Sequence, residues 1–413
     1  MRREARPFDL EALPTVAEAR RRFLAALPAW RPPEEPVPLL EAAGRVLSRD
    51  VAAGDDVPAF PRSMVDGFAV RSQDARAAMS RGLRVVGRVA MGSAPKATVG
   101  PLQAVWIPTG GPLPPGADAI VPVEATEAVG DWVRLREPVR PGDNVLSRGA
   151  DVRAGQVVLP AGHRLRAADV GALASVGCTR PWVYRRPEVA ILSMGDELVP
   201  PDRIPAEGQV RDANAYSLAA AVRADGGIPH VLGIVPDDKN RLENALRDAL
   251  QWDMVLMSGG SSVGLDDVAA EVIAKLGPPG VVVHGVRLAP GKPTVLAVVG
   301  DRAVCGLPGN PVSSLVAYDL FVRPALYWRM GWPGGRPPAT VRARLAEPLA
   351  APKGREFHAR VRLVAGPEGL VAQPVAGGSG QLATMARADG LVTVPLERSS
   401  LPAGETVEVR LLV

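Results

Sequence analysis

Two segments rich in glycine and serine each follow a run of apolar residues and precede a helix-like run, an arrangement that suits anion binding. The first, MSGGSSVGLDD, spans residues 257–267, and the second, CGLPGNPVSSLV, spans residues 305–316. Glycines let the backbone approach an oxyanion closely, and a helix N-terminus favours negative charge. Either segment alone could be a capped turn. Together, at one edge of a sheet, they predict a single anion-binding site.

Charged side chains in two further segments suit the same edge. Asp196 and Glu197, in SMGDELVPP, would lie beyond the carboxyl end of the strand-like run EVAILS. Carboxylates placed there can hold a hard cation such as Mg²⁺, or they can cap the next turn, and the pattern leaves both open. Lys292, in APGKPTV, is a loop-held ammonium suited to an oxyanion such as phosphate, although a solvated surface lysine would have the same pattern.

Two other segments look structural by themselves. Asp66 and Gly67 form a turn-like pair in FPRSMVDGFAV, and Thr109 is the one hydroxyl residue of the stiff run IPTGGPLPPGADAIVPVE. Nothing in their local pattern favours chemistry over a turn.

Several common kinds of site are missing from the sequence. It contains no GxxxxGK[ST] loop, no HExxH and no CxxC, which disfavours kinase-like enzymes and zinc proteases. Two cysteines and four scattered histidines predict neither a disulfide framework nor a zinc site. The net charge is only +4, without a block of basic and aromatic residues, so we expect no nucleic acid partner.

The elements around these segments predict an α/β protein with several domains. From about residue 188, strand-like runs alternate with helix-like runs, which is typical of a parallel or mixed sheet covered on both faces. Residues 13–28 read as an amphipathic helix capped by Thr15, and residues 167–176 as another helix. We expect a mixed α/β domain formed by 1–50 with 147–187, an inserted β-rich domain at 51–146, an α/β domain at 188–332 and a β domain at 335–413.

Targeting and membrane segments are not visible. The N-terminal residues lack the apolar core of a signal peptide, and apolar runs are interrupted well before about 18 residues. We therefore expect a cytoplasmic protein without membrane association.

Taken in order, these segments resemble the molybdopterin molybdotransferase family, which includes the C-terminal domain of gephyrin. The resemblance covers residues 35–413, and ten blocks in register make it very specific. The matching blocks are RSMVDGFAV, IPTGGPLPPGADAIVPVE, NVLSRGADVRAGQVV, ILSMGDELV, VRDANAYSL, DMVLMSGGSSVGLDD, APGKP, GLPGNPVSS, GREFHARV and GGSGQLATMARADGLVTVP.

The resemblance implies an elongated protomer with four subdomains that works as a homodimer. Its third subdomain would have the three-layer molybdopterin-binding α/β fold, beside a β-rich insertion and a C-terminal β domain. The active site would be a cleft between the α/β domain of one protomer and the insertion of the other. Asp66 and Thr109 would then face the glycine-rich loops across the dimer.

The implied reaction transfers molybdenum from molybdate to adenylyl-molybdopterin and releases AMP, with Mg²⁺ assisting. The resemblance places the catalytic positions at Asp66, Thr109, Asp151, Glu197, Asp237 and Asp267, of which Asp66, Glu197, Asp237 and Asp267 are the Mg²⁺ candidates. The substrate-binding positions would be Ser258, Gly259, Gly260, Ser261, Gly264, Lys292, Pro308, Gly309, Asn310, Pro311, Ser313, Arg355 and Ser379. Expected protein partners are the pterin-adenylylating enzyme and apo-molybdoenzymes.

The sequence departs from the family pattern at a few positions. Gly285 and Ala289 stand where many members carry lysine, which weakens the local positive field, and Arg287 is a candidate substitute. Met194 replaces a usual threonine, and Asp389 stands where asparagine is common.

Three alternatives stay open beside molybdenum insertion. Tungstate has nearly the same size and charge as molybdate, so the sequence does not separate the two ions. A non-catalytic molybdopterin carrier or scaffold would need the glycine loops but not the carboxylates. Adenylylation of the pterin belongs to a single-domain relative of the α/β block, and the additional domains here argue against it.

Overall fold

The structure is a computed structural model, and it describes residues 10–259 and 265–412. The chain forms two compact units. Unit 1 contains the chain before Pro36 and from Tyr184 onward, and unit 2 is Pro36–Val183. Within these described residues, no helix is long and apolar enough to cross a membrane.

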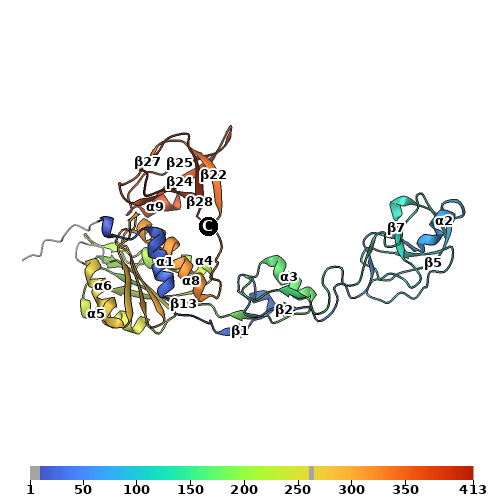
Figure 1. Cartoon of the computed structure of the whole chain (residues 1–413), viewed down its shortest axis with the longest axis horizontal. Coiled ribbons are helices and arrows are strands. Elements are labelled where there is room, and N and C mark those ends of the chain that lie inside the picture. The colour runs from blue at the N-terminus through green and yellow to red at the C-terminus, as the bar shows by residue number, and fades with distance from the viewer. Residues whose placement is uncertain (1–9, 260–264, 413) are drawn as a thin grey trace, which may run out of the picture. The chain divides into compact units, whose positions relative to one another are not determined.

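A six-stranded sheet in the order β16-β13-β17-β21-β20-β18 forms the centre of unit 1 (Figure 1). Its strands are β13 (Glu188–Met194), β16 (Ile228–Val235), β17 (Met254–Gly259), β18 (Pro279–His284), β20 (Val295–Val299) and β21 (Arg302–Leu307). β13, β16, β17 and β21 run parallel, whereas β20 is antiparallel to both of its neighbours. The carboxyl ends of the parallel strands therefore meet at one edge.

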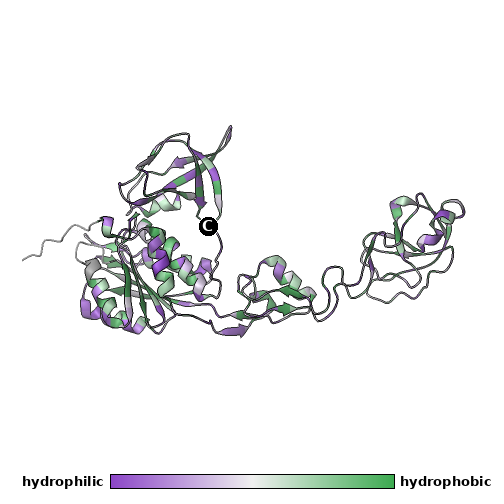
Figure 2. Cartoon of the chain, in the orientation of Figure 1, coloured by the Kyte–Doolittle hydropathy of each residue, from purple (hydrophilic) through white to green (hydrophobic). Residues whose placement is uncertain are grey.

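Helices cover both faces of this sheet, as the sequence predicts. The helices are α1 (Val16–Ala26), α4 (Asn214–Asp225), α5 (Lys239–Ala249), α6 (Leu265–Leu276), α7 (Pro311–Ala317), the π-helix η5 (Tyr318–Val322) and α8 (Arg323–Arg329). Alternate residues of β13 point to opposite faces: Val189 and Ile191 join one hydrophobic core, and Ala190 and Leu192 join the other. A strand buried on both faces requires the continuous apolar run seen in its sequence, and Figure 2 shows such runs along the sheet.

Helix α1 packs against the sheet of unit 1, which differs from the expected grouping of residues 1–50 with 147–187. Thr15 caps it as predicted, because the Thr15 hydroxyl accepts a hydrogen bond from the Glu18 N–H at 3.2 Å. Phe23 is fully buried in the same core as Val189. The amphipathic pattern predicted the helix, but it does not identify the core that the apolar face joins.

The C-terminal part of unit 1 is a small closed β structure. β24 pairs with β25 and β26, and the order β24-β25-β22-β28-β26 closes through the β24–β26 pairing. The elements are β19 (Leu288–Ala289), which adds to β24, β22 (Thr340–Leu345), β23 (Leu349–Ala350), β24 (Glu356–Gly366), β25 (Gly369–Pro374), α9 (Leu382–Ala386), β26 (Gly390–Val394), β27 (Ser400–Leu401) and β28 (Thr406–Leu411). Val361 and Val409 are fully buried inside it.

Unit 2 holds the β-rich segments. Its six-stranded sheet consists of β4 (Gly67–Val70), β5 (Leu83–Arg88), β6 (Gln103–Ile107), β7 (Ala119–Pro122), β8 (Thr126–Val129) and β9 (Trp132–Leu135), with α2 (Ala75–Arg81) beside it. A separate core contains Leu47, Leu159 and Leu173 and includes helix α3 (Ala167–Ser175), which matches the predicted helix at 167–176.

The ends of each unit are joined by hydrogen bonds. In unit 2, the Val37 N–H donates to the Pro181 carbonyl at 3.2 Å, and in unit 1 the Arg185 N–H donates to the Pro33 carbonyl at 2.7 Å. The two points where the chain passes between the units are therefore paired on each side, within unit 1 and within unit 2.

Candidate functional site

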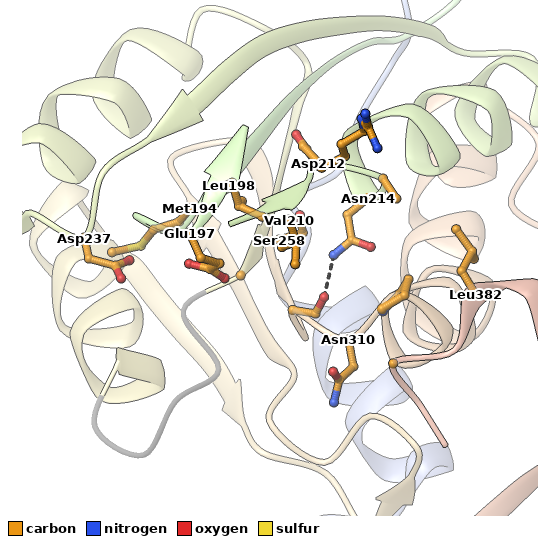
Figure 3. A pocket seen from close by; sticks show the side chains of 17 residues that line it. Met194, Glu197, Leu198, Val210, Asp212, Asn214, Asp237, Ser258, Asn310 and Leu382 are labelled. Carbon is orange, nitrogen blue, oxygen red and sulfur yellow. Dashed lines mark hydrogen bonds between the residues drawn. The ribbon is translucent and has the colours of Figure 1, made fainter. Parts of the chain in front are cut away.

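A cavity of about 660 Å³ opens at the carboxyl ends of the parallel strands of unit 1. Figure 3 shows Asp237 and Glu197 together at one end of it, with Asn310, Asn214 and Leu382 toward the other. The lining residues are Met194, Gly195, Glu197, Leu198, Val210, Arg211, Asp212, Ala213, Asn214, Asp237, Ser258, Gly259, Gly309, Asn310, Pro311, Gly380 and Leu382. Seven predicted site residues are brought together here: Glu197, Asp237, Ser258, Gly259, Gly309, Asn310 and Pro311.

The acidic end of the cavity is formed by the residues that follow β13 and β16. The Asp237 N–H donates to Oδ1 of Asp196 at 3.1 Å. Desolvation, followed by the negative charges of Asp196 and Glu197, raises the pKa of Asp237. A β-carbon built on Gly195 would lie 2.4 Å from Oε2 of Glu197, so the glycine lets this carboxylate fold back over the backbone.

This acidic group supplies two carboxylates to the cavity and not a complete set of metal ligands. Among the described residues, no group of three or more His, Cys, Asp or Glu side chains is arranged to hold a metal ion. Mg²⁺, however, commonly takes one or two carboxylates and completes its shell with water and phosphate oxygens. Glu197 and Asp237 fit that donor set, and a bound cation would favour the ionised Asp237, which burial and the neighbouring acids disfavour.

The end of β17 supplies a close backbone approach. Gly259 has φ of +109°, and a β-carbon there would lie 2.0 Å from the Met194 carbonyl oxygen, so no other residue fits without displacement. Ser258 is buried, and its hydroxyl lies 3.3 Å from the Ser193 hydroxyl. Of the other positions predicted in this segment, Gly260, Ser261 and Gly264 and the Asp267 side chain lie outside the described part of the structure.

The Pro-Gly-Asn-Pro loop after β21 is fixed from two sides. The Asn214 amide donates to the Gly309 carbonyl at 2.8 Å. On the other side, the Asn310 amide donates to the Ser379 hydroxyl at 3.0 Å, and the Val312 N–H donates to the Ser379 carbonyl at 3.1 Å. Ser379, predicted from the sequence, thus contacts the loop without lining the cavity.

Arg360 holds the C-terminal loop that carries Ser379. This buried guanidinium donates to the carbonyl oxygens of Gly378, at 3.1 Å, and Gly377, and to the Thr384 hydroxyl at 2.5 Å. Burial lowers the pKa of Arg360. Neither Arg360 nor Asn214 was predicted as a site residue, although both lie in blocks that carry the family resemblance.

Four other predicted residues of unit 1 do not line the cavity. Pro308 and Ser313 are buried beside it, at the end of β21 and in the first turn of α7. Lys292 accepts a hydrogen bond from the Val286 N–H at its carbonyl, and Arg355 lies just before β24. Arg287, the candidate substitute for the missing lysines, donates to the Gly354 carbonyl at 3.1 Å and does not line the cavity either.

Three predicted residues belong to unit 2. Asp66 accepts hydrogen bonds at Oδ1 from the Thr109 N–H, at 2.6 Å, and the Thr109 hydroxyl, at 2.9 Å. Both bonds lower the pKa of Asp66, and the bond from the backbone N–H has the larger effect. The pair forms because Gly67 of β4 lies opposite Ile107 of β6. Asp151 is exposed, and its N–H donates to the Val57 carbonyl at 3.0 Å.

Comparison with known proteins gives one consistent family. Three family models match in order: "MoeA N-terminal region (domain I and II)" over residues 14–177, "Probable molybdopterin binding domain" over 190–328, and "MoeA C-terminal region (domain IV)" over 342–412. Molybdopterin molybdenumtransferase of Nostoc sp. is 36% identical over 387 residues, which cover 91% of this chain and 88% of that protein. Molybdopterin molybdenumtransferase 2 of Mycobacterium tuberculosis is 35% identical over 381 residues, covering 90% and 94%.

Solved structures agree with the sequence relatives. A molybdopterin biosynthesis MoeA protein from Pyrococcus horikoshii superposes with a TM-score of 0.79 at 34% identity, covering 97% of this chain and 99% of that one. A second crystal structure of a MoeA protein from that organism gives 0.77 at 28% identity, covering 97% and 100%.

Proposed function

The chain belongs to the MoeA family of molybdopterin molybdenumtransferases, with a role in molybdenum cofactor biosynthesis, and we propose that it transfers molybdenum from molybdate to adenylyl-molybdopterin with release of AMP. The observation that carries the proposal is the cavity at the carboxyl edge of the sheet, with the acids Glu197 and Asp237 at one end and the Gly309–Asn310 loop at the other. Its volume lies within the range of about 300–1,000 Å³ that small-molecule sites occupy.

The proposed reaction has two parts, neither of which changes an oxidation state. In the first, a water oxygen bonds to one phosphorus of the phosphoanhydride, the bond from the bridging oxygen breaks, and AMP leaves. In the second, two metal–sulfur bonds form while one molybdate oxygen leaves as water with the two thiol protons. Both parts bring anions together, so the protein must supply donors and cations.

The residues at the two ends of the cavity divide this work. The backbone around Gly309 and Asn310 positions an oxyanion through N–H groups. Glu197 and Asp237 would hold Mg²⁺, which neutralises phosphate charge when it is bound. Their carboxylates, through that cation, would position the phosphoanhydride of the substrate for attack by water.

We infer that unit 2 completes the site in a homodimer, with Asp66, Thr109 and Asp151 supplied by the other protomer. The support is chemical: Asp66 is exposed, and its two hydrogen bonds from Thr109 lower its pKa and favour the carboxylate. Mixing Asp66→Ala and Glu197→Ala subunits tests this. Random exchange should restore about a quarter of wild-type activity if sites are shared between protomers, whereas sites within one protomer would give none.

The experiment that tests the reaction is AMP release from adenylyl-molybdopterin with Mg²⁺, compared with molybdate, with tungstate and without oxyanion. Glu197→Gln should abolish release, while Glu207→Gln, an exposed acid of the same unit, should not change it. Release stimulated by molybdate, giving a cofactor that activates an apo-molybdoenzyme, supports the proposal. Stimulation mainly by tungstate would change the metal, and pterin binding without release would indicate a carrier.

A further inference from the structure

Asn214, on the wall of the cavity, has one amide atom with a hydrogen-bond partner and one without. It is the first residue of α4, it is 9% exposed, and it lines the cavity. Its Nδ2 donates to the Gly309 carbonyl at 2.8 Å, as the dashed line in Figure 3 shows. Its Oδ1 is buried and has no hydrogen-bond partner among the described residues.

The bond to Gly309 fixes the direction of one peptide group. The Gly309 carbonyl and the Asn310 N–H belong to the same planar trans peptide, so they point in opposite directions. Holding the carbonyl toward Asn214 therefore turns the Asn310 N–H away from Asn214. Within the described chain, that N–H has no hydrogen-bond partner, so it is available as a donor. Rotation of this peptide would replace the donor with a carbonyl, which repels an anion.

The unpaired Oδ1 argues that Asn214 is not there for stability. A buried acceptor without a partner lowers stability, and an apolar side chain of similar volume would avoid that loss. Swapping the two amide atoms would put Oδ1 against the Gly309 carbonyl, so the observed orientation is the only one that makes a hydrogen bond. The contribution of Asn214 is therefore the orientation of the loop.

We propose that Asn214 is a positioning residue for the oxyanion: by holding the Gly309 carbonyl, it keeps the Asn310 N–H directed at an oxyanion oxygen. The inference rests on the proposed function. The oxyanion is either molybdate or a phosphate of the adenylyl group, which share the same acceptor chemistry. Asn214 acts through the peptide and makes no contact with the reacting atoms.

Two variants at this position separate the donor from the acceptor. Asn214→Leu removes both atoms and should lower kcat/KM by about 10- to 100-fold, as small misplacements in a site do, without lowering the thermal midpoint. Asn214→Asp keeps the shape and an acceptor but loses the donor, so it should be as impaired as Asn214→Leu. Asn244→Leu, on the exposed face of α5, is the matched control and should leave kcat/KM unchanged.

The kinetic constants identify which oxyanion the loop serves. A rise in KM for molybdate, with adenylyl-molybdopterin saturating, assigns the N–H to molybdate, and a rise in KM for adenylyl-molybdopterin assigns it to the phosphate. Either result supports the proposal. Wild-type kcat/KM in Asn214→Asp would overturn it, because the acceptor would then be the functional atom.

Amide hydrogen exchange gives a readout that does not depend on activity. Exchange across residues 309–316 should be faster in Asn214→Leu than in the wild-type chain, and unchanged exchange would overturn the positioning role. If the wild-type protein releases no AMP, the proposed function fails, and this exchange measurement still decides whether Asn214 holds the loop.

Discussion

The backbone N–H of Asp237 donates a hydrogen bond to the Asp196 carboxylate, with 3.1 Å between nitrogen and Oδ1. The contact holds two acids side by side at the edge of the cavity, with Glu197 next to them in sequence. Burial, followed by the negative charges of Asp196 and Glu197, raises the pKa of Asp237 at this edge.

The raised pKa of Asp237 predicts a pH-dependent loss of stability. Because the pKa of Asp237 is higher in the folded state than in the unfolded chain, ionising it lowers the free energy of unfolding. The loss starts as pH rises through the ordinary aspartate value of about 3.9 and is complete above the raised value. Asp237→Asn should thus have a higher thermal midpoint than wild type at pH 7, and the difference should shrink toward pH 4. Circular dichroism melts across this range measure it.

The control for this prediction is Glu207→Gln, which removes an exposed acid from the same unit and should not shift the midpoint. Mg²⁺ should raise the midpoint of wild type more than that of Asp237→Asn. A midpoint of Asp237→Asn equal to or below wild type at pH 7 would show that the ionised Asp237 does not lower stability.

The hydrogen-bonded pair of Asp66 and Thr109 predicts that removing the Thr109 hydroxyl shifts the pH dependence of kcat/KM. Thr109→Val removes the hydroxyl donor and keeps the backbone donor, so the pKa of Asp66 should rise from its lowered value. If Asp66 acts as a carboxylate, the acid limb of kcat/KM should move to higher pH. Thr109→Ser, which keeps the hydroxyl, should retain the wild-type limb, and coincident profiles for the valine and serine variants would contradict the prediction.

The close approach of the backbone at Gly259 predicts that a larger residue there lowers the stability of the protein. An added β-carbon would lie 2.0 Å from the Met194 carbonyl oxygen, and the backbone has φ of +109°. Gly259→Ala should lower the free energy of unfolding by more than about 1 kcal/mol, measured in urea. Gly334→Ala, where a β-carbon meets nothing within 4 Å, should change it by less than about 0.5 kcal/mol. Equal effects at the two glycines would rule out the steric explanation.

Arg360 donates several hydrogen bonds from one planar group, so we expect that a lysine, which keeps only the charge, does not replace it. Arg360→Met leaves the Gly377 and Gly378 carbonyls without this donor and should lower stability by about 1–3 kcal/mol in urea. Arg360→Lys keeps the charge but donates from one point, so it should recover only part of the loss. Arg362→Met, at an exposed position of the same strand, is the control. Full recovery by lysine would mean that geometry is unimportant here.

The parts of the fold that the sequence predicted are those specified by local pattern. The apolar run at 189–192 predicts a strand buried on both faces, and glycine and proline mark the loops at its carboxyl edge. Thr15 marks the start of α1 for the same local reason. The partner of that helix was not predictable, because an apolar face fits any core of suitable shape.

Within the site, predictions failed where the contact is distant in sequence. Asn214 and Gly309 are 95 residues apart, and Arg360 acts on a loop 17 to 18 residues away through backbone carbonyls. A backbone carbonyl has no residue type, so no pattern identifies it as a partner. Glu197 was predicted from its place after the strand-like run EVAILS, whereas Asp237 came only from the resemblance, since it follows a different strand and only the sheet brings the two acids together.

The discontinuity of unit 1 has a consequence for how the chain acquires its structure during synthesis. Helix α1 leaves the ribosome before any strand of its sheet exists, and residues 36–183 are made in between. Because unit 2 is continuous and joins its own ends through Val37 and Pro181, it can fold first. Helix α1 must then wait, with Phe23 exposed, until the strands that begin at β13 emerge. Unit 2 can therefore complete its fold before helix α1 packs on its sheet, although helix α1 is synthesised first.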